Sequence, residues 1–456
     1  MTGQADPADI TRFLARFVSE AAGADPSASR AAANLRTRVV AMMPDVVRDM
    51  RITPGPDTDA AAVRAEIVRA LIGRPAKGVQ PVAPDADLVE ALLDEMVGLG
   101  PLEALRRDPD VTDILVNRYD DVHVERNGRL EAAPVAFVSE NHFLSLVHRL
   151  VGRAGRRVDQ ASPIADALLP DGSRLNIVLP PLSVNGPTMS LRRHATRNLS
   201  MPQLVSAGSL SFGVSALLVL AVKARWNILI TGGAGAGKTT LLNAMSAYVE
   251  PGERVITVED VAELQLRQRH VVRLQTRPAS LEGGGEVTLR DLVRQTLRMR
   301  SDRVIVGEVR GPEAWDMLTA MNTGAQGSLG TLHANRPLDA MLRLEGLVAL
   351  ANPTLGLSAI RSNIASALDL VVHVARFTDG VRRITDIDEV GVAGDDGIGL
   401  RPLYRYRGGR LGAAATGTET GDYFPPSPGI IAAAEGLQLQ ELLTAFTSAG
   451  TPSGSA

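Results

Sequence analysis

The sequence predicts an α/β protein whose largest domain is built on a mostly parallel sheet. Segments with helical periodicity alternate with short apolar stretches, and this alternation is typical of βαβ units. The apolar stretches have the length and β-branched content of buried strands, and they are NILIT (227–231), RVITVED (254–260), RVIVGEV (303–309) and LVVHVAR (370–376). With 456 residues, of which 45% are hydrophobic, the chain is long enough for about two to four domains, each with its own core.

The composition disfavours several classes of protein. A net charge of only −3 argues against a broad basic surface that wraps nucleic acid, although it permits a local basic channel. The absence of cysteine excludes disulfides and thiolate metal sites, so we expect a cytoplasmic protein. The start, MTGQADPADITRFL, lacks the basic and apolar regions of a signal peptide. Residues 198–222 carry no charge, but proline, glycine and serine interrupt them, so we predict a buried helix rather than a membrane span.

Residues 1–84 are predicted to form a helical N-terminal arm and a linker. Amphipathic helices rich in Ala and Arg extend to about residue 52, where the breaker run TPGPD follows, and a further helix covers about 58–72. The segment GRPAKGVQPVAPD (73–85) has the composition of an exposed linker. We therefore expect the arm to be mobile.

Residues 85–195 are predicted to form a smaller α+β domain. An amphipathic helix beginning near Asp87 is followed by alternating strands around an Asn127-Gly128 turn and by a second helix, NHFLSLVHRLVGRAG. We expect 189–204 to contain a connector to the domain with the parallel sheet, which covers 196–415. Residues 416–456 are rich in Gly, Thr, Ala, Ser and Pro and are predicted to form a tail with one short helix at 430–447.

A phosphate-binding loop follows the first predicted strand of the large domain. NILIT runs into GGAGAGKTT and then into a helical stretch, which is the strand, G-x-x-x-x-G-K-T, helix arrangement. Glycines let backbone N–H groups point at phosphate oxygens, and the helix N-terminus adds its dipole. We expect Lys238 to bridge the β- and γ-phosphates and Thr239 to bind Mg²⁺. The predicted nucleotide-binding residues are Gly232, Gly233, Ala234, Gly235, Ala236, Gly237, Lys238, Thr239 and Thr240.

Two acidic residues stand at the ends of later strands. RVITVED ends in Glu259 and Asp260, and RVIVGEV contains Glu308 near its end. In a parallel sheet this edge also carries the phosphate loop, so both glutamates are expected to face the γ-phosphate. One can polarise the attacking water while the other holds Mg²⁺ or its water shell.

These motifs, taken in order, resemble a known family. GGAGAGKTT, VITVEDVAELQL, LRMRSDRVIVGEVRGPEAWDML and MNTGAQGSLGTLHANRP are similar to the motifs of the ATPases of type II and type IV secretion and of pilus assembly. Within that superfamily the chain resembles the CpaF-like ATPases of Tad (Flp) pili. Upstream, LLDEMVGLGPLEALRRDPDVTDILVN, GRRVDQASPIADALLPDGSRLNIVLPP and MSLRRH resemble the N-terminal domain of that subgroup. The resemblance covers about residues 85–390.

The resemblance implies a RecA-like P-loop ATPase domain at 196–415, with ATP and Mg²⁺ as cofactors. GGAGAGKTT would be its Walker A motif, VITVEDVAEL its aspartate box, RVIVGEV its Walker B motif and GSLGTLHA its histidine box. It further implies a homo-hexamer that binds ATP between the N-terminal and RecA-like domains of each protomer. The ring would lie at the inner face of the cytoplasmic membrane, attached through an inner-membrane platform protein, with no direct nucleic-acid partner. Hydrolysis would move the domains as rigid bodies and drive pilin addition.

The resemblance also assigns roles to single residues. Glu259 would polarise the attacking water, and Glu308, with Thr239, would hold Mg²⁺. His333, on the turn after the strand-like SLGTL, would hydrogen-bond near the γ-phosphate and report its loss. The other six histidines are predicted to be packed or solvated without such a role. Relatives often have a second histidine earlier in this box, where this chain reads TGAQGSLG.

Arginines from the N-terminal domain are expected to complete the site. In rings of this kind guanidinium groups stabilise charge on the transferred phosphate. The segment DALLPDGSR offers Arg174, and MSLRRH offers Arg192 and Arg193. Close relatives have a segment similar to DARLPDGSR, so Leu168 occupies a position at which they have an arginine.

Other functions stay open at this point. A type IV secretion or conjugation ATPase belongs to the same superfamily and shares the four motifs. A nucleotide-switched binding protein with little hydrolysis would contain the same phosphate loop. A helicase is disfavoured because only 3% of the residues are aromatic and few could stack on bases. Type II secretion relatives commonly carry a four-cysteine zinc module, which this cysteine-free chain lacks.

Overall fold

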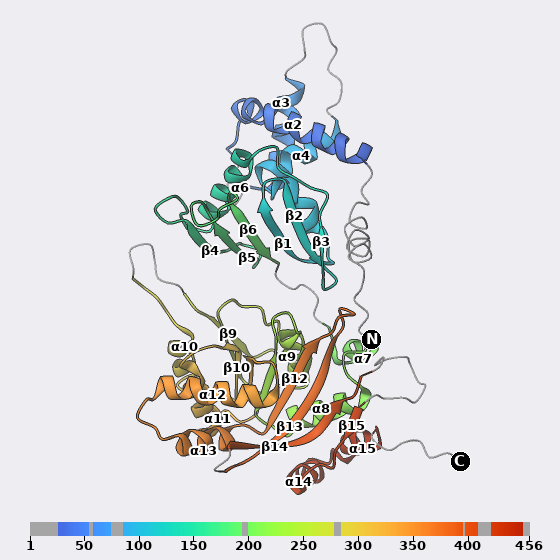
Figure 1. The fold of residues 1–456 in the computed structure, drawn as a ribbon, viewed down its shortest axis with the longest axis vertical. Coiled ribbons are helices and arrows are strands. Elements are labelled where there is room, and N and C mark those ends of the chain that lie inside the picture. The colour runs from blue at the N-terminus through green and yellow to red at the C-terminus, as the bar shows by residue number, and fades with distance from the viewer. Residues whose placement is uncertain are drawn as a thin grey trace, which may run out of the picture. The chain divides into compact units, whose positions relative to one another are not determined.

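The computed structural model describes residues 26–53, 58–73, 85–193, 199–277, 284–394, 397–408 and 421–449. The chain divides into two compact units, residues 1–194 and 195–456 (Figure 1). Each unit has its own sheet and its own hydrophobic core. The first 25 residues of the predicted arm and most of the predicted linker at 73–85 lie outside the described residues.

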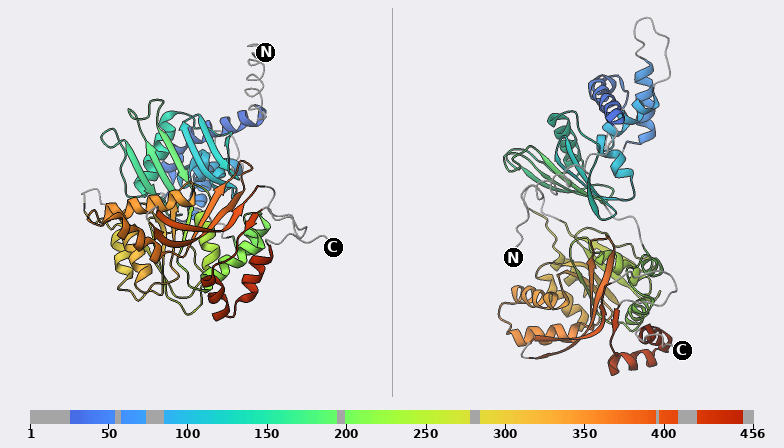
Figure 2. Two further views of the ribbon diagram at one scale, coloured as in Figure 1. Left: turned by 60° about the horizontal axis from the view of Figure 1, so that its bottom comes forward. Right: turned by 45° about the vertical axis from the view of Figure 1, so that its right-hand side comes forward.

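Unit 1 contains a six-stranded antiparallel sheet in the order β3-β2-β1-β6-β5-β4. One face of the sheet packs against α6 (Figure 2). Side chains alternate along the strands, and the core between sheet and helix includes Ile114, Phe143 and Leu175. The Asn127-Gly128 turn joins β2 to β3, as predicted, with positive φ at both residues. The strands are β1 (Val111–Arg118), β2 (Asp121–Arg126), β3 (Arg129–Ala132), β4 (Ile164–Leu168), β5 (Arg174–Val178) and β6 (Thr188–Arg192). The helices are α2 (Pro26–Asp49), α3 (Ala60–Ile72), α4 (Ala86–Met96), the 3-10 turn η1 (Gly100–Leu102), α5 (Glu103–Arg107) and α6 (Glu140–Arg153).

The helices of the predicted arm are packed, not mobile. Val46 of α2, Val63 and Ile67 of α3, and Leu92 of α4 are fully buried in one small core. The expectation of a mobile arm is therefore wrong for α2 and α3. The prediction was wrong because the sequence does not show that α4, which follows the linker, covers the apolar faces of α2 and α3.

Unit 2 contains a nine-stranded sheet in the order β15-β14-β13-β12-β7-β11-β10-β8-β9. The six strands from β12 to β9 run parallel, and the other three extend the sheet as antiparallel strands. All four strands predicted from the sequence are confirmed. The strands are β7 (Ile228–Gly232), β8 (Val255–Glu259), β9 (Val271–Gln275), β10 (Arg303–Val309), β11 (Leu329–His333), β12 (Leu370–Arg376), β13 (Arg382–Gly394), β14 (Gly397–Tyr406) and β15 (Gly421–Tyr423).

Helices cover both faces of this sheet. In β7, Ile228 and Ile230 join one core and Leu229 joins the core on the opposite face. This double coverage explains why the central strands are apolar throughout. The helices are α7 (Met201–Ser206), α8 (Phe212–Lys223), α9 (Lys238–Ser246), α10 (Leu289–Thr296), α11 (Glu313–Asn322), α12 (Pro337–Ala351), α13 (Leu357–Ala367), α14 (Pro428–Gly436) and α15 (Gln440–Ala449).

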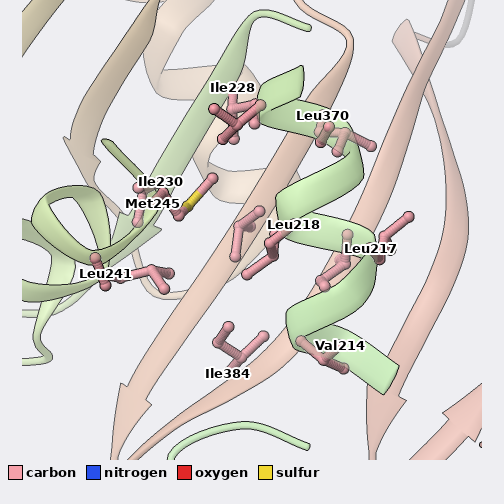
Figure 3. Packing of buried hydrophobic residues seen from close by; sticks show 14 of the residues in the cluster. Val214, Leu217, Leu218, Ile228, Ile230, Leu241, Met245, Leu370 and Ile384 are labelled. Atoms are coloured by element: carbon pink, nitrogen blue, oxygen red, sulfur yellow. The ribbon is translucent and has the colours of Figure 1, made fainter. Parts of the chain in front are cut away.

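The uncharged segment before β7 forms the buried helix that the sequence predicts. Leu217 and Leu218 of α8 pack against Ile228 and Leu370 on the sheet (Figure 3). Ten of the twelve residues of α8 are buried, which accounts for the lack of charge before its last residue, Lys223. Within the described ranges, no helix combines the length and hydrophobicity needed to cross a bilayer.

Two boundary predictions are corrected. Residues 188–192 are not a connector but the strand β6 between β1 and β5, because Met189 and Leu191 alternate into the core. The described part of the tail contains β15, α14 and α15 instead of one helix. Gln438 has a φ of 56° and ends the first helical segment, and Phe446 of α15 is fully buried in the large core.

Candidate nucleotide-binding site

The phosphate loop connects β7 to α9. All five residues of β7 are buried, and the last of them, Gly232, begins the loop. A Cβ atom at Gly232 would lie 2.3 Å from the carbonyl oxygen of Val374 in the neighbouring strand β12, so only glycine fits there. Gly237 has a φ of 98° and precedes α9 without a side-chain cap. The backbone N–H groups of the first helical turn are therefore available to an anionic ligand.

Lys238 is folded back over the loop. Its Nζ donates hydrogen bonds to the carbonyl oxygens of Gly232 at 3.0 Å and Gly233 at 2.9 Å. The same atom lies 3.4 Å from Nδ1 of His333. These contacts hold the ammonium group at the phosphate loop.

The carboxyl ends of three neighbouring strands bring Lys238, Glu308 and His333 together. His333 pairs with Gly232 across β11 and β7, and Glu308 belongs to β10 on the other side of β11. Nδ1 of His333 is 3.4 Å from Oε1 of Glu308, and their side chains are 36% and 24% exposed. A ligand can reach both groups. His333 is the last residue of the strand, so the expectation that it lies on the following turn is corrected by one position.

Glu308 is held ionised by its neighbours. Burial raises the pKa of its carboxyl, but the Arg310 hydrogen bond and the charges of Arg310, Lys238 and His333 outweigh burial and lower the pKa below its usual value. Arg310 donates to Oε2 of Glu308 at 2.5 Å and lies 3.7 Å from Oδ2 of Asp260. None of the candidate site residues predicted from the sequence is Arg310. Its signal was its position, directly after the Walker B strand and two residues from Glu308.

Glu259 has a different environment. Its side chain is buried, Oε1 accepts hydrogen bonds from the backbone N–H groups of Glu263 and Leu264 at 2.9 Å each, and Oε2 has no partner within the described structure. Burial raises the pKa of this carboxyl, and the two backbone hydrogen bonds only partly oppose that effect. Glu259 also lies beside Gly307, where a Cβ atom would come within 2.9 Å of its Cγ. Its observed hydrogen bonds hold the backbone of 263–264.

The loop residues fit a nucleoside triphosphate with Mg²⁺. Thr239 and Thr240 are half-buried in the first turn of α9, next to the N–H groups that face the loop. The Thr239 hydroxyl and the Glu308 carboxylate are the protein oxygens that would hold Mg²⁺. Mg²⁺ takes few protein ligands of this kind and completes its octahedron with phosphate and water oxygens.

Two of the three predicted arginines, Arg174 and Arg192, lie in one row across the sheet of unit 1. The register pairs Leu168 with Arg174, Arg174 with Arg192, and Arg192 with Asp113. Arg192 is exposed and donates to Asp113 at 3.0 Å. An arginine at position 168 would lie beside Arg174 in this row.

Arg193 is engaged by its own unit. Its Nη1 donates to the backbone carbonyl oxygens of Asp108 and of Val111, the latter at 2.7 Å. Burial lowers the pKa of its guanidinium. Among the three arginines, Arg193 therefore has the clearest structural role.

Comparisons with known proteins give a consistent result. The family described as "Type II/IV secretion system protein" matches residues 95–393. Two Mycobacterium tuberculosis proteins, named for conjugal transfer, are 44% identical over 307 residues, which cover 66% of this chain and 86% of theirs. The conjugal transfer protein TrbB of Rhizobium radiobacter is 34% identical over 287 residues, covering 61% and 84%. The solved VirB11 ATPase of the Brucella suis type IV secretion system is 28% identical, covers 63% of this chain and 95% of its own, and has a TM-score of 0.35.

Proposed function

The chain belongs to the type II/IV secretion system protein family, a family of secretion ATPases, and on this premise we propose that it hydrolyses ATP to drive assembly of a Tad/Flp-type pilus. The observation that carries the proposal is the meeting of Lys238, Glu308 and His333 at the carboxyl ends of β7, β10 and β11. A cation and an ionised carboxylate at a phosphate loop provide the electrostatic stabilisation that phosphoryl transfer to water requires, and the imidazole adds a hydrogen-bonding group beside them.

The residues divide this work. The loop 232–240 binds the phosphates, and Thr239 and Glu308 would hold Mg²⁺, which would neutralise charge on the phosphates. Glu259 polarises the attacking water through its unpartnered Oε2, as its raised pKa permits for a base. His333 contacts the γ-phosphate and reports its loss.

The N-terminal unit is proposed to complete the site in a homo-hexamer. Arg174 and either Arg192 or Arg193 supply guanidinium groups to the transferred phosphate. The exposed Arg192 is better available for this role than Arg193, whose guanidinium binds two backbone carbonyls. An inner-membrane platform protein is the proposed partner, and it attaches the ring to the cytoplasmic face of the membrane.

A second candidate is a conjugation ATPase of a type IV secretion system. The names of the relatives support it, because two M. tuberculosis proteins and the R. radiobacter protein are named for conjugal transfer. The genes beside this one distinguish the two candidates. Genes for small pilins and a platform protein support pilus assembly, and genes for a relaxase and a coupling protein support conjugation.

The test of the ATPase is turnover with and without Mg²⁺. We expect hydrolysis that is slow for the isolated protein, because domain motion limits the rate when the membrane partner is absent. Lys238→Ala should abolish turnover while its thermal unfolding stays near that of the parent, because the ammonium group donates to two carbonyl oxygens of the loop and lies beside His333. Lys223→Ala, which removes an exposed lysine paired with Glu250, is the control and should keep full turnover. Equal hydrolysis by the parent and Lys238→Ala contradicts the assignment, and undetectable hydrolysis by the parent with intact nucleotide binding supports a nucleotide switch instead.

A further inference from the structure

The hairpin of β12 and β13 packs against the phosphate loop. β12 runs parallel to β7, so the turn between β12 and β13 lies at the same edge of the sheet as the loop (Figure 1). Val374 of β12 pairs with Gly232, and its carbonyl oxygen occupies the space where a Cβ atom at Gly232 would be. None of the sequence motifs predicts that this hairpin belongs to the site.

His373 binds the base of the loop. It is 5% exposed on β12 and lies opposite Thr231, the residue before Gly232. The Thr231 hydroxyl is 2.9 Å from Nδ1 of His373. Burial lowers the pKa of this imidazole, although Asp386 and Asp339 and a backbone hydrogen bond with Asn335 oppose the shift. The imidazole is therefore neutral at neutral pH, and its Nδ1 can accept the hydroxyl proton.

Arg382 binds the tip of the loop. Its Nε donates to the carbonyl oxygen of Gly235 at 2.8 Å. Its Cδ atom would lie 3.1 Å from a Cβ atom at Gly237, so the stem of the side chain runs along the loop. Arg376, at the other side of the hairpin turn, brings Nη1 within 3.6 Å of the Cβ position of Gly235.

We propose that the β12–β13 hairpin positions the phosphate loop, with His373 holding its base through Thr231 and Arg382 holding its tip through the Gly235 carbonyl. The proposal rests on the proposed ATPase function. A carbonyl oxygen that turned into the loop would repel phosphate, whereas N–H groups attract it. Arg382 keeps the Gly235 carbonyl outside the cradle, and His373 fixes the strand end from which the loop starts. Both are positioning residues whose loss weakens nucleotide binding.

The contact at the base of the phosphate loop is tested by changing each of its two residues, Thr231 and His373. Thr231→Val removes the hydroxyl with little change in volume, and His373→Leu removes the imidazole. Each should raise KM for ATP and Kd for a fluorescent ADP analogue by about two- to tenfold, the scale of one neutral hydrogen bond, with kcat within about twofold. His373→Asn keeps an acceptor near Nδ1 and should recover part of the affinity lost in His373→Leu. Thr257→Val is the control, because Thr257 is an equally buried threonine on β8 whose hydroxyl has no partner in the described structure.

The tip is tested by Arg382→Ala and Arg382→Lys. Both remove Nε, the group that binds Gly235, so both should raise KM and Kd by about two- to tenfold even though lysine keeps the charge. Arg401→Ala is the control. Arg401 also lies on an antiparallel strand of this sheet, and it donates to the backbone carbonyl of Pro425. Both residues are far from the phosphate loop in the sequence. We expect the KM and Kd of Arg401→Ala to equal those of the parent.

The results separate three outcomes. A rise in KM and Kd at both anchors, with thermal unfolding close to that of the controls, supports the proposal. If His373→Leu does not fold, Thr231→Val and Arg382→Ala decide, since the first keeps the core volume and the second alters a loop contact at the surface. Unchanged KM and Kd in these two, or a loss of activity that follows only the fraction of unfolded protein, overturns the proposal. Lys238→Ala, measured in parallel, tests the ATPase function independently of the hairpin. If Lys238→Ala is inactive while the anchor variants behave like the parent, the proposed role of the hairpin is wrong and the proposed ATPase function stands.

Discussion

The two edges of the parallel strands in unit 2 contain the same kinds of charged side chain and use them differently. At the amino edge, Arg303 is fully buried and donates to Glu253 at 2.7 and 2.9 Å, and also to the carbonyl oxygens of Gly327 and Val222. At the carboxyl edge, Glu308 and His333 are partly exposed and 3.4 Å apart. A charge whose partners are close and complete stabilises the fold, whereas a charge that is accessible and loosely paired can bind a ligand.

The largest expected effect is a loss of stability when the buried ion pair at the amino edge is removed. Arg303→Met removes both hydrogen bonds of the guanidinium to the buried Glu253 carboxylate, which keeps an ion pair with the more exposed Arg225 at 3.1 Å, and it should lower the free energy of unfolding by about 3–5 kcal/mol. Urea unfolding measures this loss. Arg336→Met removes a 73% exposed arginine from a surface pair with Asp339 and should leave the free energy nearly unchanged. Folded Arg303→Met should hydrolyse ATP like the parent, and a specific loss of turnover at full folding would contradict the separation of the two edges.

The next effect concerns the acid assigned to water at the carboxyl edge. Glu259→Gln keeps the size of the side chain and removes its charge, so hydrolysis should fall by about 10² or more while nucleotide binding survives. Steady-state turnover and a nucleotide titration measure the two quantities. Glu308→Gln is the comparison, because Glu308 lies directly beside His333. A larger loss of turnover in Glu308→Gln than in Glu259→Gln, with Mg²⁺ affinity intact, would move the role of the base to Glu308.

A smaller effect is expected at the imidazole of the same edge. His333→Ala removes the proposed contact to the γ-phosphate without disturbing the core, so it should fold normally and lower turnover by about tenfold, or uncouple turnover from pilus assembly. His123→Ala in unit 1 is the control, since both histidine side chains are 36% exposed. If His333→Ala has the turnover and assembly of the parent, His333 has no role in the reaction.

What the sequence predicts well is local. The phosphate loop is a contiguous pattern, and the central strands of unit 2 are apolar because helices cover both faces of the sheet. The packing of α2 and α3 on α4 depends on contacts across a linker, and β6 is identified only by its pairing with β1 and β5. Such pairings leave little trace in a single sequence.

Side-chain partners show the same limit. Glu308 and His333 belong to motifs, but the sequence does not indicate that Glu308 is ionised beside Arg310 and Lys238 while Glu259 is buried against backbone amides. His373 has no motif around it. Its contact with Thr231 exists because two parallel strands put the residues in register.

The smallest predicted effect sharpens the contrast between the two glutamates, and it is a difference in sign. The ordinary pKa of both carboxyls is 4.5, and the fold lowers that of Glu308 and raises that of Glu259. A lowered pKa means that Glu308 contributes stability above pH 4.5, and that this contribution is lost as pH falls through its folded value. A raised pKa means the reverse for Glu259, because the folded state disfavours its charged form and stability is lost as pH rises from 4.5 through the folded value. At neutral pH, Glu308→Gln should therefore lower Tm and Glu259→Gln should raise it. Both differences from the parent should shrink as the pH of the thermal unfolding experiment approaches 4.5 and falls below it. Shifts of the same sign in the two variants, or shifts that do not change with pH, would show that the two carboxyls share one environment.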